Sequence, residues 1–347
     1  MTQYDSVVLF NAPVIQERAG SREKLYPANF VREDVWAIAE CLENVGHAPC
    51  VIMLDRFSED IITTLLKISP DFVFNLCEEI DGQCECEMHV AGLLELMGIP
   101  YTGSDSFVLG LSLNKFHVKR ILSAAGIPTA RAFLCYPGQQ PSAPANMHFP
   151  MFVKPAREDA SLGINSDSVC RNEAELAFQV DYIHRVYKQE ALIESYLDGR
   201  EFNVSVAGNS PPEVLSISEI DFTGLPEEEP RIVSYRAKWD EASAQFRCTR
   251  PVCPAELPDS LERQIKAVAL QSFRAIGCRD YGRIDMRTDS CGNLYVLEVN
   301  PNPDISPSAG FARAAKVAGY SYQEIILRIT ESAMDRVAKM GTQVYAF

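Results

Sequence analysis

The chain has 347 residues, of which 47% are hydrophobic and 23% charged, and its formal net charge is −15. This length suits two or three globular domains, and no apolar run approaches the roughly 18 residues of a membrane-spanning helix. So acidic a chain repels a phosphate backbone, which excludes nucleic acid as an expected partner, and no membrane partner is expected. No basic segment precedes the first apolar run, so we expect no signal peptide and a cytoplasmic location.

The amino-terminal third alternates short apolar runs with amphipathic segments. The apolar runs predict strands at 6–12, 50–54 and 71–77. Apolar residues at helical spacing predict helices at 31–46 and 58–69. This rhythm is typical of a parallel sheet covered by helices. The turn-rich segment 98–105 predicts a domain boundary.

The middle of the chain predicts a second set of elements. One continuous helix is expected at 107–126, ended by Gly126 and Pro128. Asn172 is expected to cap the next helix, with Glu175 three residues later. The other expected elements are the strands 149–156, 191–197, 200–208 and 212–222.

The last third predicts an amphipathic helix, a β-hairpin and two closing helices. The helix 259–277 opens with acidic residues, and its apolar residues recur at helical spacing. The hairpin 281–300 has its turn at SCGN. Ser321 and Glu324 are expected to cap the final helix.

The hairpin carries oxygen ligands close together. Side chains alternate along a strand, so Glu298 and Asn300 are expected on one face, with Asp285 beside them if the strands of hairpin 281–300 pair. Two carboxylates and an amide oxygen suit Mg²⁺, which shares such ligands with phosphate oxygens and water. One acid alone at a strand end is usually just solvated. The set, beside Arg283, predicts a metal site.

Three lysines are candidate phosphate ligands. Lys154 ends an apolar strand, where a cation is costly unless a negative group meets it. Lys115 and Lys238, each taken alone, are more often surface residues. Ser161 and Gly163 follow soon after Lys154, and their backbone N–H groups could cradle a phosphate. The segment is neither a Walker A loop nor a dinucleotide-binding glycine motif.

The 11 cysteines are scattered and odd in number, and without an export signal we expect reduced thiols. One tight group stands out, formed by Cys84, Cys86 and His89. No second pair with zinc-finger spacing stands nearby, so an ordinary loop-to-helix segment is favoured over a metal site.

A series of motifs in the same order resembles the D-alanine–D-alanine ligase branch of the ATP-grasp superfamily. The motifs are GLLELMGIPYTGS, LNKFHVKRILSAAGIPT, FPMFVKPARE-x-x-S-x-G, ALIESYLDGREFNV, AKW, PAELPDSL and GRIDMRTDSCGNLYVLEVNPNP. The resemblance covers about 70 to 330. It implies an α/β (α+β) fold of the ATP-grasp type with three domains, 1–108, 109–197 and 198–347, and ATP between the last two. A homodimer is implied by the resemblance alone.

The resemblance also implies a role for each matching residue. Lys115 and Lys154 would contact the ATP phosphates, and Lys238 the γ-phosphate. Arg283, Lys238 and Ser161 would be catalytic, Arg283 by stabilising the developing tetrahedral anion. The other implied ligands are Glu194, Ser195, Tyr196 and Leu197 for adenine, Glu201 for the ribose, Ser161 and Gly163 in the loop over the phosphates, and Asp285, Glu298 and Asn300 for two Mg²⁺ ions, with Mn²⁺ as a substitute.

The chain departs from the family's pattern on the substrate side. Ala160 stands where the family has a catalytic serine in the phosphate-covering loop, and Trp239 stands in place of a tyrosine. Cys77 replaces a histidine, and Asp304 replaces a glycine. Trp239 could instead pack the lid and Asp304 could be a turn residue, and both alternatives stay open.

Three further positions concern the substrates. The Ser–Leu pair that holds the acceptor's carboxylate in the family falls at Ala309 and Gly310. Glu33 is a candidate for the residue that binds a substrate amine. We therefore expect a substrate pocket that differs from that of a D-alanine–D-alanine ligase.

Three functions follow as hypotheses. The first is an ATP-dependent ligase of specialised metabolism that joins a small carboxylate to an amine through an acyl phosphate. The second is a D-alanine–D-alanine ligase of cell-wall synthesis. The third is a non-catalytic nucleotide-binding module, against which the intact Lys154 and Asp285–Glu298–Asn300 set argues.

Overall fold

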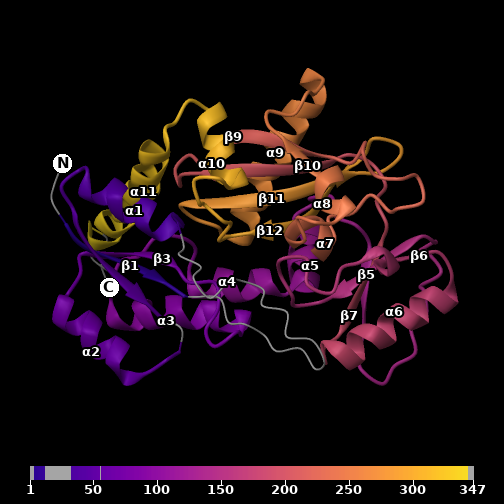
Figure 1. Ribbon diagram of the computed structural model, residues 1–347, viewed down its shortest axis with the longest axis horizontal. Helices are drawn as coiled ribbons and strands as arrows, with labels where there is room; N and C mark the ends of the chain where they lie inside the picture. The colour runs from indigo at the N-terminus through magenta and orange to yellow at the C-terminus, as the bar shows by residue number, and fades with distance from the viewer. Residues whose placement is uncertain (1–3, 12–32, 55, 343–347) are drawn as a thin grey trace.

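The computed structural model describes residues 4–11, 33–54 and 56–342. Its strands form three separate sheets of three, four and five strands (Figure 1). Each sheet draws its strands from one of the three expected domain ranges. The division into domains itself remains a prediction. None of the helices in the described part of the chain is long and apolar enough to cross a membrane.

The first sheet is parallel, as the alternating pattern predicts. Its strands are β1 (Asp5–Phe10), β2 (Ala48–Met53) and β3 (Phe72–Leu76), in the order β2-β1-β3. Its helices are α1 (Glu33–Glu43), α2 (Glu59–Ile68) and α3 (Glu87–Met97), with the short 3₁₀ helix η1 (Cys84–Cys86) before α3. Val8 packs with α1, whereas Val7 and Leu9 pack with α2 and α3. Alternate side chains therefore serve the cores on the two faces. Positions 31 and 32 of the expected first helix lie outside the described residues.

The four-stranded sheet is antiparallel. Its strands are β4 (Ala132–Cys135), β5 (Met151–Pro155), β6 (Val169–Cys170) and β7 (Ala191–Ser195), in the order β4-β7-β5-β6. The 3₁₀ helix η2 (Ser166–Ser168) precedes β6, and α6 (Glu173–Val186) packs on the sheet. The prediction for the cap of α6 is confirmed, since the Asn172 side chain accepts a hydrogen bond from the Glu175 N–H.

The prediction of one helix over 107–126 is wrong. The chain forms α4 (Ser106–Leu113) and α5 (Lys115–Ala124), which are separated at Asn114. The Asn114 side chain accepts a hydrogen bond from the His117 N–H at 3.1 Å and so starts a new helix. An asparagine side chain competes with the helical backbone in this way, which the apolar periodicity does not reveal.

The five-stranded sheet contains the predicted hairpin. Its strands are β8 (Glu201–Ala207), β9 (Glu213–Asp221), β10 (Arg250–Val252), β11 (Tyr281–Thr288) and β12 (Leu294–Asn300), antiparallel in the order β10-β9-β8-β11-β12. Its helices are α7 (Tyr235–Trp239), α8 (Ala244–Cys248), α9 (Asp259–Ile276) and α10 (Gly310–Val317). Ile265, Ala269 and Phe273 of α9 pack in one core with β8, β11 and β12. The amphipathic pattern of this helix is thus confirmed.

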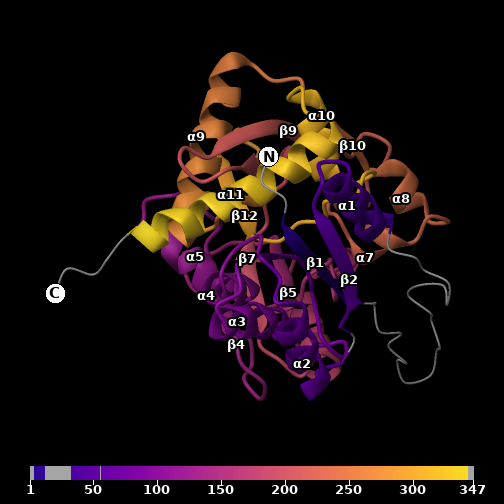
Figure 2. The same ribbon diagram turned by 90° about the vertical axis from the view of Figure 1, so that its left-hand side faces the viewer.

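The final helix, α11 (Tyr322–Thr342), returns to the first sheet (Figures 1 and 2). Ile325, Ile326 and Ile329 share a core with α1 and with the first sheet. The expected capping box is confirmed, because Ser321 Oγ accepts from the Glu324 N–H and Glu324 Oε2 accepts from the Ser321 N–H. The end of the chain therefore ties the sheet that carries the hairpin to the amino-terminal sheet.

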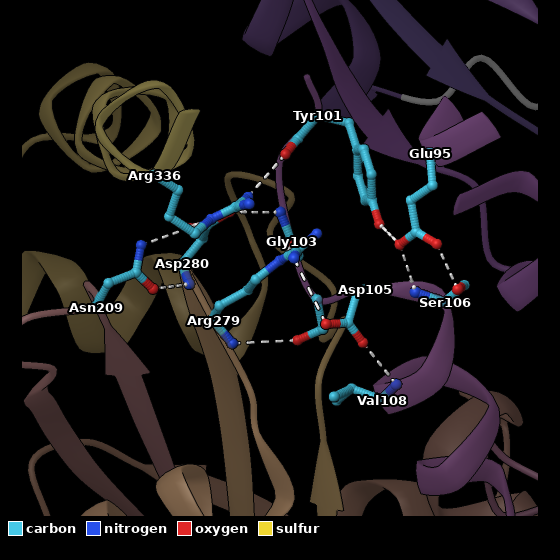
Figure 3. A network of polar contacts seen from close by, with 11 residues as sticks. Glu95, Tyr101, Gly103, Asp105, Ser106, Val108, Asn209, Arg279, Asp280 and Arg336 are labelled. Carbon is cyan, nitrogen blue, oxygen red and sulfur yellow. Dashed lines mark hydrogen bonds and ion pairs between the residues drawn. The ribbon is translucent and has the colours of Figure 1, made fainter. Parts of the chain in front are cut away.

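A buried carboxylate strengthens this tie (Figure 3). Asp280, immediately before β11, is fully buried and accepts hydrogen bonds from the Gly103 N–H, from Asn209 and from two nitrogens of Arg336 on α11. Arg336 also donates to the carbonyl of Tyr101. One side chain thus joins the segment after α3, the loop after β8, the start of β11 and α11.

Replacing Asp280 with asparagine is expected to destabilise the protein by about 3 kcal/mol, because Arg336 loses its carboxylate in a buried site. The backbone of Asp280 has a φ of 64°, which asparagine tolerates, so the substitution removes the charge without adding strain. The measurement is the midpoint of urea unfolding. Asp335→Asn, on the exposed face of α11, is the matched control. Equal midpoints for the two variants would contradict the role given to Asp280.

Candidate active site

A cavity of about 710 Å³ lies between the four-stranded and the five-stranded sheets. Side chains of β5 and β7 line one side, those of β8, β11 and β12 line the other, and the loop 158–164 and α7 also contribute. Most of the residues singled out from the sequence line this one cavity: Lys115, Lys154, Ser161, Glu194, Ser195, Tyr196, Leu197, Glu201, Lys238, Arg283, Asp285, Glu298, Asn300, Asp304, Ala309 and Gly310. Their individual roles remain predictions.

The hairpin register places the expected metal ligands together. Asp285 on β11 lies directly opposite Glu298 on β12, and Asn300 lies opposite Arg283. Both oxygens of Asp285 accept hydrogen bonds of 2.7 Å from Arg283, and one also accepts from Asn203. Each carboxylate oxygen keeps lone-pair capacity beyond these bonds. The donor set of two carboxylates and an amide oxygen therefore fits Mg²⁺.

Neighbouring cations keep one carboxylate of this pair ionised. Burial by itself raises the pKa of Glu298, but Lys115, Lys154 and Arg283 outweigh burial and hold that pKa below its usual range. Glu298 is thus ionised at neutral pH. No cluster of three or more His, Cys, Asp or Glu side chains with metal-binding geometry occurs in the described ranges. The predicted set differs from such a cluster because its third ligand is the amide of Asn300.

Two of the three candidate lysines lie at the cavity beside acidic partners. Lys154 is only 5% exposed, and its Nζ lies 3.4 Å from Glu194 Oε1, which Lys119 Nζ also approaches at 3.1 Å. The expectation that a strand lysine needs a negative group is confirmed. Lys115 is 6% exposed, and its Nζ lies 2.8 Å from Asp159 Oδ1. Lys238 lies on α7 at the same cavity.

The loop after Lys154 has an unusual backbone. Ala160 and Ser161 have φ values of 54° and 62°, a left-handed conformation that costs roughly 1–3 kcal/mol at a non-glycine residue. The loop is held from the α7 side, because Ser161 Oγ donates to the Val233 carbonyl and Trp239 Nε1 donates to the Ala160 carbonyl. The loop 158–164 and α7 are therefore joined to each other beside the lysines.

Asp159 is expected to compete with nucleotide phosphate for Lys115. Its side chain is 52% exposed, so its ion pair is partly solvated and of modest strength. Asp159→Asn should tighten ATP binding by about two- to fivefold, the amount that such a partly exposed pair contributes. Equilibrium titration with ATP measures this change. Weaker binding in the variant would instead show that Asp159 supports the site.

The end of β7 lies beside a cation that the sequence interpretation missed. Tyr196 lies under the guanidinium of Arg287, whose carbon is 5.5 Å from the ring centroid. Arg287 also donates to Glu201 Oε2 at 3.0 Å. Burial raises the pKa of Glu201 to about 7, although Arg287 opposes this shift. A signal did exist in the sequence, since Arg283, Asp285 and Arg287 alternate along one strand and so share a face.

Four of the expected residues do not line the cavity. Gly163 packs closely against Pro155, since a Cβ at position 163 would lie only 2.6 Å from Pro155 Cγ. Glu33 begins α1 and is exposed. Cys77 is fully buried, and its carbonyl accepts a hydrogen bond from Asn302. Trp239 is 42% exposed and contacts the loop as described above, which favours lid packing. A direct substrate contact by the indole stays a prediction.

Two other features complete the placement of the expected residues. Asp304 lines the cavity, and its Oδ1 also accepts the Ser306 N–H, so it is both a turn residue and a residue of the cavity wall. Cys84 and Cys86 form η1, and His89 is exposed on α3. Cys84 Sγ lies 3.8 Å from the Arg157 carbonyl. This places the acidic loop before α3 against the loop that follows Lys154.

Comparison with known proteins agrees with this geometry. The family model described as "D-ala D-ala ligase C-terminus" matches residues 121–331. The uncharacterized protein y4sG of Sinorhizobium fredii is 33% identical over 86% of this chain and 87% of its own length. A D-alanine–D-alanine ligase of Carboxydothermus hydrogenoformans is 30% identical over 84% of this chain and 90% of its own.

Among solved structures, the D-alanine–D-alanine ligase of Bacillus anthracis complexed with ATP matches with a TM-score of 0.73 at 23% identity. The match covers 97% of this chain and 99% of that one. This likeness shows a common ATP-grasp fold. Together with the family model and the sequence relatives, it means that the chain belongs to the D-alanine–D-alanine ligase family of ATP-dependent carbon–nitrogen ligases.

Proposed function

We propose that the protein joins a carboxylate to an amine by way of an acyl phosphate and releases ADP and phosphate. One observation carries the proposal. Lys115, Lys154, Asp285, Glu298 and Arg283 come from four elements, α5, β5, β11 and β12, yet all line one cavity. Opposite charges are thus gathered where a triphosphate and a divalent ion would fit.

Activation of the carboxylate is the step that needs ATP. A carboxylate is a poor electrophile, whereas an acyl phosphate carries a good leaving group that an amine can displace. Phosphoryl transfer depends on positioning and charge neutralisation rather than on a protein nucleophile. Lys115 and Lys154 would hold the phosphates, and Lys238 would reach the γ-phosphate.

The hairpin would supply the metal ligands. Asp285, Glu298 and Asn300 would hold Mg²⁺, two ions in our proposal, and Mn²⁺ would suit the same oxygens. When bound, the metal would neutralise charge on the phosphate oxygens. Arg283 would stabilise the negative charge that develops on the oxygen of the tetrahedral intermediate, because its guanidinium already lies beside Asp285 in the cavity.

The remaining cavity residues suit the nucleoside and the exclusion of water. The segment from Glu194 to Leu197 would contact adenine, and Glu201 would bind the ribose, held in place by Arg287. The loop that contains Ser161 lies beside the lysines and is tied to α7 by the hydrogen bond from Trp239 Nε1 to the Ala160 carbonyl. Closure of this loop would protect the acyl phosphate from hydrolysis.

The substrates are proposed to differ from two D-alanines. Ala160 lacks the hydroxyl of the family's serine, and Asp304 puts a carboxylate into the cavity wall. An acidic group would be repelled by Asp304 unless a cation intervenes, whereas an ammonium would be attracted. These changes alter the shape and charge of the substrate pocket but leave the ATP-binding groups in place.

The test is an ADP-release screen over pairs of amino acids and small carboxylic acids, with the product identified by mass. A new amide, formed with one ADP, would support the proposal. Formation of D-alanyl-D-alanine would instead establish the second candidate, which the ligase relatives at 30–31% identity favour. ATP binding without phosphate release from any pair would point to a non-catalytic module.

A further inference from the structure

Two buried serines face the cavity without a role in the proposed mechanism. Ser205 on β8 is 2% exposed and Ser218 on β9 is 5% exposed, and both line the cavity. Among the described residues, neither hydroxyl has a hydrogen-bond partner. A buried hydroxyl without a partner is costly, so both groups are open to a ligand in the cavity.

The alternation of side chains along the two strands turns these hydroxyls toward the cavity. On β8, Phe202 and Val204 pack in a core with α9, whereas Ser205 lines the cavity. On β9, Ile217 enters the same core, whereas Ser218 lines the cavity. Successive side chains of a strand point to opposite faces of its sheet. The two hydroxyls, called the hydroxyl patch below, are therefore held on the sheet itself and not on a loop.

The sheet register places the hydroxyl patch beside the groups that are proposed to act in the reaction. Ser205 lies directly opposite Arg283 of β11. Ser218 lies opposite Asn203, which in turn lies opposite Asp285. Because neighbouring strands are about 4.8 Å apart, the patch begins one strand away from Arg283. A substrate that reacts beside Arg283 is thus within reach of the patch through a short side chain.

The surroundings of the hydroxyl patch favour a neutral ligand group. Each serine hydroxyl can donate one hydrogen bond and accept others. The two charged neighbours on β11, Arg283 and Asp285, already form an ion pair with each other. Asn203, between the patch and Asp285, donates to that carboxylate through Nδ2. A hydroxyl or carboxamide group, which both donates and accepts, therefore matches the patch better than an ion does.

We propose that the hydroxyl patch binds a neutral hydrogen-bonding group, a hydroxyl or a carboxamide, on the side chain of one of the two substrates. The inference rests on the proposed ligase function and adds a class of substrate to it. Water would satisfy the two serines in an empty cavity, and a ligand group that cannot reproduce those hydrogen bonds loses affinity when it displaces the water. An alkyl side chain, such as the methyl group of alanine, would leave both hydroxyls unpaired.

Calorimetric titration of matched compounds tests the proposal. The pairs are serine and alanine, threonine and valine, and asparagine and leucine, each as both enantiomers, together with lactate and propionate. Each compound is titrated with Mg²⁺ and a non-hydrolysable ATP analogue present. We expect at least one polar compound to bind the wild type with a Kd about 10- to 100-fold below that of its apolar partner, the effect of satisfying buried hydroxyls.

Variants of the serines separate recognition by the hydroxyl patch from support of the sheet. In the double variant Ser205→Ala, Ser218→Ala, the preference for the polar compound should fall below about threefold, while the Kd of the ATP analogue stays unchanged. Ser216→Ala is the matched control. Ser216 is also buried and lies opposite Ser205, but it is outside the cavity lining and its hydroxyl accepts from Cys253 Sγ. This variant should keep the full preference.

The proposal would be overturned if no compound of the panel binds, if the apolar compounds bind as tightly as their polar partners, if the double variant keeps the preference, or if Ser216→Ala abolishes it. Loss of affinity for the ATP analogue in the double variant would also overturn it, because the hydroxyls would then serve the nucleotide. The proposed ligase function fails separately, if the ATP analogue does not bind the wild type or if no pair releases ADP in the screen described above. Titrations repeated without nucleotide would still measure the preference, so the two failures are distinguishable.

Discussion

Replacing Asp285 with asparagine should lower ATP turnover by about a thousandfold, since the variant loses a metal ligand and the partner that orients Arg283. Asparagine keeps the size of the side chain. Glu298 remains in the facing register position, so Arg283 still has a carboxylate nearby and the fold should survive. The measurement is ADP release at increasing Mg²⁺ concentration, with circular dichroism as the check on folding.

Asp289→Asn is the matched control for this substitution. Asp289 lies just beyond β11 on the same hairpin, and its side chain accepts hydrogen bonds within the turn, outside the cavity lining. An asparagine can accept the same backbone hydrogen bonds. If Asp285→Asn and the control both kept near-normal turnover, the role given to Asp285 in the reaction would be wrong.

Replacing Lys154 with methionine should weaken ATP binding by about 10- to 100-fold, the effect of removing one charged hydrogen-bond donor from a phosphate. Methionine preserves most of the volume of the buried side chain. Titration with the ATP analogue measures the Kd. Since Lys119 still contacts Glu194 Oε1, the carboxylate in this pair is not left alone.

Lys119→Met separates the two lysines that share Glu194. Lys119 is also buried, but it lies outside the cavity lining. Its loss should lower the unfolding midpoint while the Kd for the ATP analogue changes much less than in Lys154→Met. If both variants lost affinity equally, the effect would come from Glu194 and not from a contact between Lys154 and phosphate.

The local pattern of the chain predicts much of the fold because apolar residues recur at regular intervals along its helices and strands. The parallel first sheet, the hairpin of β11 and β12, and the caps at Asn172 and Ser321 all follow from short-range chemistry. Periodicity failed at Asn114, where a single side chain broke an otherwise helical run. A pattern averaged over a turn does not register one competing hydrogen bond.

For a related reason, only part of the candidate site could be predicted from local sequence. The acids of the hairpin could be placed together because strand register is local, and Asp285 does face Glu298. Spacing alone could not bring Lys115 and Lys154 to those acids, and that step came from the resemblance. Neither route indicated Asp159 as the partner of Lys115, because that contact joins a loop to a helix start across 44 positions.

The sequence by itself determined the class of elements, the family and the carboxylate–amide set of the hairpin, since each depends on residue type and on neighbours within a few positions. Only the tertiary structure decided which charges meet. It pairs Arg283 with Asp285, places two lysines on Glu194, leaves Trp239 and Cys77 outside the cavity lining, and puts Arg313 in the cavity wall. Such pairings depend on distances between elements far apart in the chain, which no local pattern contains.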